Sequence, residues 1–349
     1  MTMAETLAEI VNIPSVLGSE GRLCTALEER ALATWGRDGV VRIGNSIVAG
    51  RRTGRPIISL YGHIDTVPEQ GQGDAKIVDG RLIGLGSTDM KSGVAVMLHL
   101  MEDSDVTDGP YDVISVFYAG EEGPADENGL GDVLEEAPWL TESEFAVVLE
   151  PTDLDLHLGC QGVVNARVFF DGHAAHSSRP WLGENAITKA GAFLIEMHAW
   201  EHKPVTVDGL EYTEVFSVTQ AKGGVARNII PSSFELALNH RFPPNITVEE
   251  AEARLRDVAA AADRIEIVDR APGASVPVDN DHLERLAAIA GTKRKPKQGW
   301  TDVARLSAAG VPAVNYGPGE TSQAHQVGES VALANLDECY RVLKELLTN

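Results

Sequence analysis

The sequence predicts an α/β fold in which a sheet is covered by helices and a smaller α+β unit is inserted. Three short runs, at 57–62, 111–118 and 145–149, are apolar at nearly every position. Such runs are too short for core helices and are typical of buried strands of a parallel sheet. Beyond Pro151 the pattern changes to the order βαββαβ, which is that of the split ferredoxin-like unit.

The inserted unit is predicted to occupy residues 163–273, between the two parts of a discontinuous larger domain at 1–162 and 274–349. Its predicted elements are a strand at 163–170, a helix at 185–198, strands at 214–219 and 234–239, a helix at 247–262 and a strand at 265–269. Thr247 and Glu250 form a capping box for the second helix, and Ala271-Pro272-Gly273 is the predicted exit hinge.

The larger domain is predicted to begin with a helix capped by Thr2 and Glu5, followed by a second helix from Ser19. Its other predicted elements are a strand at 44–50, a helix from Val94, a helix at 282–290, a strand at 313–316 and a closing helix after Asn335.

The composition excludes several classes of partner. The formal net charge of −23 argues against nucleic acid and against an anionic membrane surface, since both favour clustered Lys and Arg. No apolar stretch reaches the length of a membrane span, and the amino terminus lacks the features of an export signal. We therefore expect a cytoplasmic protein. With 349 residues, of which 43% are hydrophobic, the chain can build one large domain or two moderate ones.

The cysteines agree with a reducing compartment. Cys24, Cys160 and Cys339 are odd in number, far apart and without C-x-x-C spacing. This pattern argues against a disulfide framework and against a thiolate zinc site, so we expect three buried, small apolar residues.

A histidine and an acid follow the first predicted strand. His63 and Asp65 fall near its carboxyl end, where open α/β sheets bind ligands. A neutral imidazole can bind a metal while a carboxylate holds its other ring nitrogen and fixes its orientation. Taken alone, the pair is more often an ordinary strand-end histidine beside a loop aspartate.

Other chemistry-bearing residues recur at similar places. Asp89 precedes a buried helix and can be an N-cap, a ligand or both, because a carboxylate has two oxygens. Glu121 and Glu122 follow the second strand, where adjacent carboxylates are costly unless a cation or a proton separates them. Glu150 follows the third strand, and His325 arrives from beyond the insertion.

Together these residues indicate a metal site. Two imidazoles with several carboxylates and no thiolates suit zinc or another borderline divalent ion, and the set is large enough for two ions that share one carboxylate. Capping and solubility alone do not explain why five separate elements each deliver such a residue.

The same stretches resemble a known family, the dinuclear zinc aminoacylase and carboxypeptidase group of metallohydrolases. The matching stretches are Gly62-His63-Ile64-Asp65, Gly86-Ser87-Thr88-Asp89-Met90-Lys91, Glu121-Glu122-Gly123, Glu150-Pro151 and Ala324-His325. The resemblance covers nearly the whole chain. It implies a zinc-peptidase-like mixed sheet with helices on both faces, and two Zn²⁺ ions with Co²⁺ as an alternative metal.

The resemblance also implies a role for each residue of the site. His63 and Glu150 would hold one zinc ion, Glu122 and His325 the other, and Asp89 would bridge the two. Asp65 would orient His63. Glu121 would be the general base, taking a proton from the attacking water and returning it to the leaving amine.

In the insertion, the resemblance implies a lid that also joins two subunits into a homodimer. His176, in Gly172-His173-Ala174-Ala175-His176-Ser177, would stabilise the oxyanion in the partner's site. Arg179, Asn228, Arg241 and the loop Gly317-Pro318-Gly319, through Gly319, would bind substrate. Without the resemblance, His176 would be read as a surface residue, Asn228 as part of a surface turn and Arg241 as a strand-end charge.

The substrate implied by the resemblance is a small N-acyl amino acid. Three stretches look most like desuccinylases of the actinobacterial kind, which remove succinate from N-succinyl-L,L-diaminopimelate in lysine biosynthesis: Gly120-Glu121-Glu122-Gly123-Pro124-Ala125, Arg179-Pro180-Trp181 and Gly299-Trp300-Thr301-Asp302. Gly299-Trp300-Thr301-Asp302 departs from the Gly-Thr-Ser-Asp of the other desuccinylase branch. The alternatives are an enzyme acting on N-acetylornithine, another N-acyl amino acid or a dipeptide, and a metal-stabilised scaffold protein without catalysis.

Overall fold

The computed structural model describes residues 1–349 and divides into two compact units. Unit 1 consists of Met1–Gly159, Val276–Lys295 and Asp302–Asn349, and unit 2 of Cys160–Ser275 and Pro296–Thr301. The insertion predicted at 163–273 lies within unit 2, which also takes in short segments on either side of it and the separate segment Pro296–Thr301. Each unit is described by itself.

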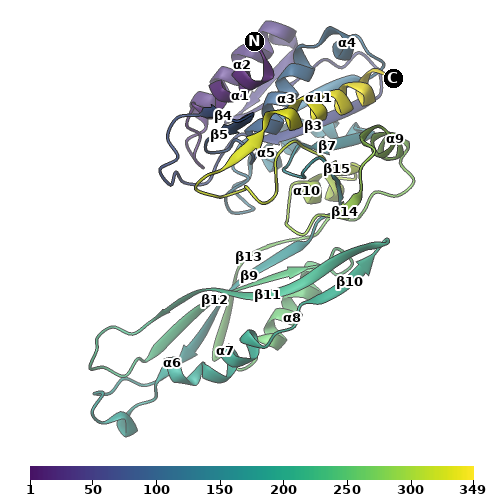
Figure 1. Ribbon diagram of the computed structural model, residues 1–349. Coiled ribbons are helices and arrows are strands. Elements are labelled where there is room, and N and C mark those ends of the chain that lie inside the picture. The colour runs from purple at the N-terminus through teal and green to yellow at the C-terminus, as the bar shows by residue number, and fades with distance from the viewer. The chain divides into compact units, whose positions relative to one another are not determined.

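Unit 1 is built on an eight-stranded mixed sheet in the order β1-β2-β6-β3-β7-β15-β8-β14. Figure 1 labels its strands β3, β7, β14 and β15. The strands are β1 Val40–Ile43, β2 Ser46–Ala49, β3 Ile57–His63, β6 Asp112–Tyr118, β7 Phe145–Val148, β8 Leu156–Leu158, β14 Arg294–Pro296 and β15 Ala313–Asn315. The four neighbours β6, β3, β7 and β15 run parallel to one another. Their carboxyl ends therefore meet at one edge of the sheet, which is where ligands bind in such folds.

The parallel strands form because their residues are apolar and buried on both faces. All residues of β3, β6 and β7 are buried, as expected for strands covered by helices on both sides. The α-helices of unit 1 are α1 Met3–Val11, α2 Gly21–Trp35, α3 Lys91–Glu102, α4 Ser104–Thr107, α5 Gly129–Glu136, α9 Asp281–Ala290, α10 Val303–Ala308 and α11 Leu333–Thr348. Short 3-10 turns lie at Arg37–Gly39 and Pro138–Glu142. The α/β prediction is confirmed.

A second, three-stranded sheet in unit 1 was not predicted. It has the order β16-β5-β4 and consists of β4 Lys76–Val78, β5 Arg81–Ile83 and β16 Ser330–Ala332. Each strand has only three residues, too few to show a period of two in the sequence. This small sheet joins the segment before Asp89 to the segment after His325, which are more than two hundred residues apart in the chain.

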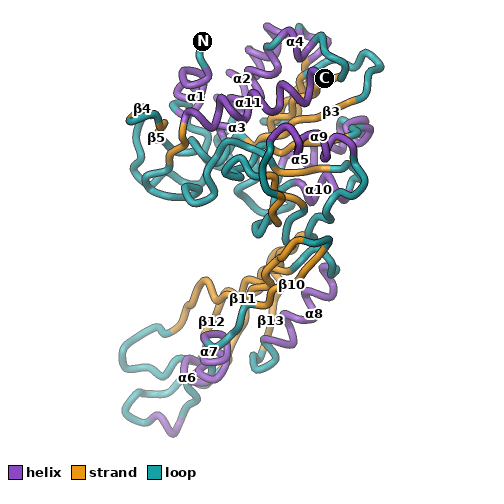
Figure 2. Tube along the Cα trace, turned by 45° about the vertical axis from the view of Figure 1, so that its right-hand side comes forward, coloured by secondary structure: helices purple, strands orange, loops and turns teal.

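Unit 2 is a five-stranded antiparallel sheet in the order β10-β11-β12-β9-β13, packed against helices (Figure 2). Its elements are β9 Gly162–Asp171, a 3-10 turn at Pro180–Leu182, α6 Ala186–Lys189, α7 Gly191–His198, β10 Lys203–Val207, β11 Leu210–Gly223, β12 Ser233–Phe242, α8 Val248–Val258 and β13 Arg264–Ala271. Without β10, this is the order of the predicted ferredoxin-like unit. The extra strand β10 pairs with β11 at the edge of the sheet.

The helix starts that were predicted from capping boxes are found in the structure. Capping boxes form at Thr2 with Glu5 and at Thr247 with Glu250, as predicted. The helix predicted from Ser19 begins two residues later, at Gly21, and no side chain caps it. The three cysteines are free and buried, which confirms their expected role. No helix has the length and hydropathy needed to cross a membrane.

The core of unit 2 contains a histidine in an apolar stack. His240 is fully buried, and its ring lies parallel to Phe216 at 3.9 Å between centroids. Its Nε2 lies 2.9 Å from Glu214 Oε1, which also pairs with Arg254. Burial lowers the pKa of His240, although hydrogen bonding to Glu214 opposes this shift. The folded unit therefore favours the neutral imidazole.

This burial predicts that unit 2 loses stability as the pH falls below 6.5, the ordinary pKa of histidine. In that range the unfolded chain takes up a proton that folded His240 resists, so protons favour unfolding. In urea denaturation at pH 7.5 and 5.5, the wild type should lose more unfolding free energy than His240→Phe, which keeps the ring stack. Equal losses in the two proteins would contradict the prediction.

Candidate metal centre

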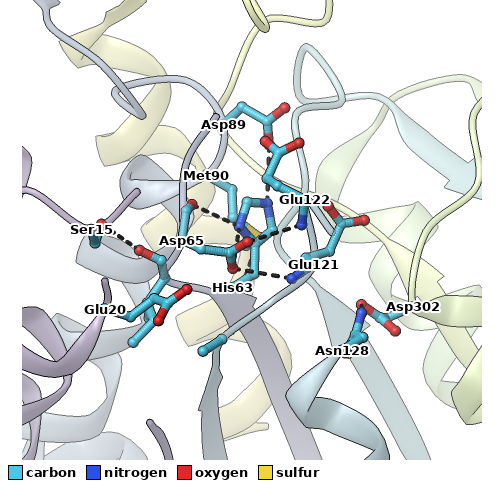
Figure 3. Close-up of polar contacts among 12 residues, drawn as sticks. Ser15, Glu20, His63, Asp65, Asp89, Met90, Glu121, Glu122, Asn128 and Asp302 are labelled. Atoms are coloured by element: carbon cyan, nitrogen blue, oxygen red, sulfur yellow. Dashed lines mark hydrogen bonds and ion pairs between the residues drawn. The ribbon is translucent and has the colours of Figure 1, made fainter. Parts of the chain in front are cut away.

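Asp65 fixes the end of β3 and the start of the loop after β6. Its backbone carbonyl lies 3.1 Å from His63 Nδ1, and its carboxylate accepts hydrogen bonds from the backbone N–H groups of Glu121, at 3.2 Å, and Glu122, at 2.9 Å (Figure 3). Both His63 and Asp65 are buried. Asp65 thus fixes the position of the His63 ring relative to both glutamates. The Nε2 atom of His63 points away from Asp65.

Asp89 lies beside the Nε2 atom of His63. Its Oδ1 is 3.2 Å from His63 Nε2. The first residue of α3 is Lys91 and the N-cap position is Met90, whose side chain makes no capping bond. The interpretation of Asp89 as an N-cap is therefore wrong, because its carboxylate points to the two histidines rather than to the helix. The Met90 sulfur instead accepts a hydrogen bond from the His63 backbone.

Glu150 and His325 complete the arrangement from two other segments. Glu150 follows β7 and its Oε1 lies 3.8 Å from His63 Nε2. His325 lies between β15 and β16, with its Nε2 at 3.0 Å from Glu122 and 3.5 Å from Asp89 Oδ2. The two histidines thus contact different oxygens of the same Asp89 carboxylate.

The Gly317–Gly319 loop packs directly on the backbone that carries these residues. A Cβ atom at Gly317 would lie 2.4 Å from the Glu150 carbonyl oxygen, and one at Gly319 would lie 2.2 Å from the Thr88 carbonyl oxygen. No side chain fits at either position without moving backbone. Glycine is therefore required here by close approach.

The ligand atoms form groups that share members. His63, Asp89 and Glu150 make one group and Asp89, Glu122 and His325 another, and the ligand atoms within each group lie within 4.8 Å of one another. A third group of the same kind consists of His63, Glu121 and Glu122. Nitrogen and oxygen donors without thiolates suit borderline divalent ions, and a shared carboxylate is what a pair of ions requires. The residues therefore fit two metal ions.

The electrostatics of the cluster point the same way. Burial opposes protonation of His63, yet hydrogen bonding to Asp65 and Asp89 raises its pKa well above the ordinary value. Hydrogen bonding to Asp89 and Glu122 raises the pKa of His325 to about 10. Protons therefore take the place that a cation would occupy among these carboxylates. Burial likewise raises the pKa of Glu121 well above its ordinary value, and the charge of Glu150 adds to this shift.

Sequence reasoning missed the residues that support this cluster. Asp302, fully buried, accepts a hydrogen bond from Asn128 at 2.9 Å and pairs with Arg305 at 2.9 Å. Arg305 also donates to the Ala125 carbonyl, so α10 fastens the loop that carries the two glutamates. Figure 3 shows Asp302 and Asn128 beside Glu121. The only sequence clue was that Asp302 ends the Gly299–Asp302 motif, to which no role was assigned.

Glu329 was also missed. Its side chain accepts hydrogen bonds from the backbone N–H groups of Gly86, Thr88 and Asp89. Lys91, buried nearby, donates to the carbonyls of Ile10 at 3.1 Å and Ile13 at 3.0 Å, and burial lowers its pKa to about 7. Neither residue belongs to a local pattern that would reveal its contacts.

Four predicted residues lie in unit 2, in two separate places. His176 and Asn228 belong to paired loops, since His176 bridges Ile229 and the Ser177 N–H donates to the Asn228 carbonyl at 3.0 Å. Arg179 follows in the first of these loops. Arg241, by contrast, lies at the far end of β12, opposite Val163. The ten-residue strand β12 spans about 30 Å, so Arg241 and Asn228 of one chain cannot contact the same small molecule.

The fold and the histidine–carboxylate cluster are typical of a metal-dependent hydrolase. The chain belongs to peptidase family M20/M25/M40, whose sequence model matches residues 59–349.

Relatives of known name span nearly the whole chain. A Mycobacterium tuberculosis protein provisionally named succinyl-diaminopimelate desuccinylase DapE is 36% identical over 98% of this chain and 97% of its own length. The succinyl-diaminopimelate desuccinylase of Corynebacterium glutamicum is 35% identical over 97% and 94%. In fold, the chain is similar to a tripeptidase of Staphylococcus aureus, with a TM-score of 0.82 at 21% identity over 99% of this chain and 97% of the other.

The raised histidine pKa values predict that metal binding releases protons. At neutral pH, His325 and His63 carry protons that a divalent ion must displace, so the apparent metal affinity should fall as the pH falls. Calorimetric titration of metal-free protein with Zn²⁺ at pH 8 and 6.5, in buffers of different ionisation enthalpy, measures the number of protons released. Binding without proton release, or with equal affinity at both pH values, would contradict this prediction.

Proposed function

We propose that the chain is a dinuclear zinc enzyme that removes the succinyl group from N-succinyl-L,L-diaminopimelate, giving succinate and L,L-diaminopimelate. The observation that carries the reaction type is the pair of ligand groups sharing Asp89, with Glu121 beside them. The substrate rests on near full-length similarity to two proteins named as desuccinylases. We place the reaction in the cytoplasm, in lysine and diaminopimelate biosynthesis.

The proposed metal roles follow the two ligand groups. His63 and Glu150 would hold one ion and Glu122 and His325 the other, and Asp89, whose two oxygens lie against the two histidines, would be shared by both. Zinc suits the nitrogen and oxygen donors, and Co²⁺ fits the same set. When bound, the ions acidify a water molecule and polarise the amide carbonyl of the substrate.

Glu121 acts as general base and then as general acid in this proposal. It lies next in sequence to the ligand Glu122, and Asp65 holds its backbone N–H, so its carboxylate is positioned without being needed to hold a metal. Burial raises the pKa of Glu121, which makes its carboxylate a stronger base than that of an exposed glutamate. Glu121 then gives this proton to the amine that leaves. Asp65 keeps the His63 ring in its tautomer and orientation throughout.

His176 is suited to stabilise an oxyanion. Its Nδ1 accepts a hydrogen bond from the Ser178 backbone N–H at 3.1 Å, so in the neutral ring the proton lies on Nε2. The Nε2–H group is then a donor on an exposed side chain. Preorganised donors of this kind are among the largest contributions to acyl-transfer catalysis.

The distance between Arg241 and the other proposed substrate residues of unit 2 supports a homodimer formed through this unit. Arg241 lies near Gly162, where the chain enters unit 2, whereas His176, Arg179 and Asn228 lie about 30 Å away at the other end of β12. We propose that Gly319 binds substrate beside the metal ligands of unit 1, and that Arg241 and the distant loops of one chain serve the sites of different subunits. Arginine forks suit the carboxylates of the proposed substrate.

Glu121→Gln should lower kcat at least about 100-fold, because the glutamine side chain cannot take up the proton of the attacking water. Metal content, measured by elemental analysis after dialysis, should stay at the wild-type value. Glu127→Gln is the matched control, since Glu127 is exposed in the same loop and should leave activity unchanged. Normal turnover in Glu121→Gln would show that another group is the base.

The substrate proposal is tested by release of primary amine from N-succinyl-L,L-diaminopimelate, N-acetylornithine and a few dipeptides. We expect a strong preference for the succinyl substrate, loss of activity with a chelator and recovery with Zn²⁺. Activity on the other compounds alone would keep the mechanism and reject the desuccinylase assignment. Metal binding without hydrolysis of any of them would favour the scaffold alternative.

A further inference from the structure

One buried glutamate organises the loop that carries the shared carboxylate. Glu329 lies four residues after His325, immediately before β16, and its relative exposure is 1%. Its Oε2 accepts a hydrogen bond from the Gly86 N–H at 2.8 Å. Its Oε1 accepts from Thr88 at 2.8 Å and from Asp89 at 3.0 Å. A single side chain thus satisfies three backbone donors within four residues.

These contacts determine where the Asp89 carboxylate points. The Asp89 backbone N–H is fixed by Glu329, while its Oδ1 and Oδ2 lie against His63 and His325. A carboxylate shared by two ions must present one oxygen to each side, so a small rotation of the loop would spoil both sets of contacts. Hydrogen bonds that orient ligands in this way strongly affect metal affinity.

The same short segment also supplies one of the ligands. His325 and Glu329 are separated by one turn, in which the Glu329 N–H donates to the Gln326 carbonyl at 3.0 Å. The Glu329 carbonyl in turn accepts from Gly84, and β16 pairs with β5 just before the Asp89 loop. The segment therefore contacts Asp89 twice, through the His325 ring and through the Glu329 carboxylate.

A buried lysine lies close to this carboxylate. Lys91 is 1% exposed, is held by two carbonyl oxygens at the end of the first helix, and interacts electrostatically with Glu329. A neutral side chain could replace the bulk of Glu329 but could not accept all three hydrogen bonds.

We propose that Glu329 is a positioning residue that sets the Asp89 carboxylate between the two metal ions. This inference rests on the metal roles proposed above but not on the identity of the substrate. It makes Glu329 part of the metal centre although it supplies no ligand atom. The centre then depends on a residue that acts through the backbone of the Asp89 loop.

The test is the metal affinity of Glu329→Gln. Glutamine has the same shape, but its NH₂ group cannot accept, so either Gly86 or the Thr88–Asp89 pair loses its acceptor. Metal-free wild type, Glu329→Gln and the control Glu338→Gln, a partly exposed glutamate of α11, are titrated with Co²⁺, whose visible absorption reports the ligand geometry. We expect two ions per wild-type chain, a 10- to 100-fold weaker affinity and an altered spectrum in Glu329→Gln, and wild-type behaviour in the control.

Further measurements separate positioning from a general loss of stability. If Glu329 only stabilises the fold, Glu329→Gln lowers the unfolding temperature but keeps the wild-type metal affinity and spectrum, which would overturn the proposal. Positioning predicts that excess metal restores much of kcat. If the glutamine variant does not fold, Glu329→Asp, which keeps the charge with a shorter reach, should give an intermediate affinity, and wild-type affinity there would also overturn it.

The titration also separates this proposal from the proposed function. It uses no substrate, so a wild type that binds two ions but does not cleave the succinyl compound would reject only the substrate assignment. A wild type that binds a single Co²⁺ ion would overturn the role of Glu329 as well, because no second ion would then share Asp89.

Discussion

The candidate metal centre depends on the hydrogen bonds that the Asp65 carboxylate accepts. This carboxylate joins the ends of two adjacent parallel strands, because it lies after β3 and accepts hydrogen bonds from the two residues that follow the β6 turn. Without it, His63 and the Glu121–Glu122 pair would be set by separate loops. Since the acceptor is charged and buried, these bonds are stronger than ordinary backbone bonds.

The rest of the centre follows from the topology of unit 1. Four parallel strands end side by side, so their loops deliver an imidazole, two adjacent carboxylates, a third carboxylate and a glycine-rich turn to one edge of the sheet. Concentrating so much negative charge is unfavourable by itself. The raised pKa values of both histidines show how strongly the cluster attracts positive charge.

Much of this arrangement was predictable because the strands are apolar and their ends carry the reactive residues. The α/β class, the two capping boxes and the ferredoxin-like order all follow from local periodicity and spacing. Long-range contacts carry no such pattern. Glu329 and Asp89 are 240 residues apart in the chain. No residue near Glu329 in the sequence indicates that its side chain accepts hydrogen bonds from three backbone N–H groups. Asp89 itself stood where a helix cap is common, and only the structure shows that it turns away from the helix.

The close packing at Gly317 and Gly319 limits which positions of the protein can be substituted during evolution. Any side chain there would displace the backbone at Glu150 and next to Asp89, so a substitution at either glycine would also disturb these two candidate metal ligands. The loops that hold His176 and Asn228 are exposed and tolerate new side chains more readily. In the proposed enzyme, substrate preference can therefore change through these loops of unit 2 while the metal ligands of unit 1 stay the same.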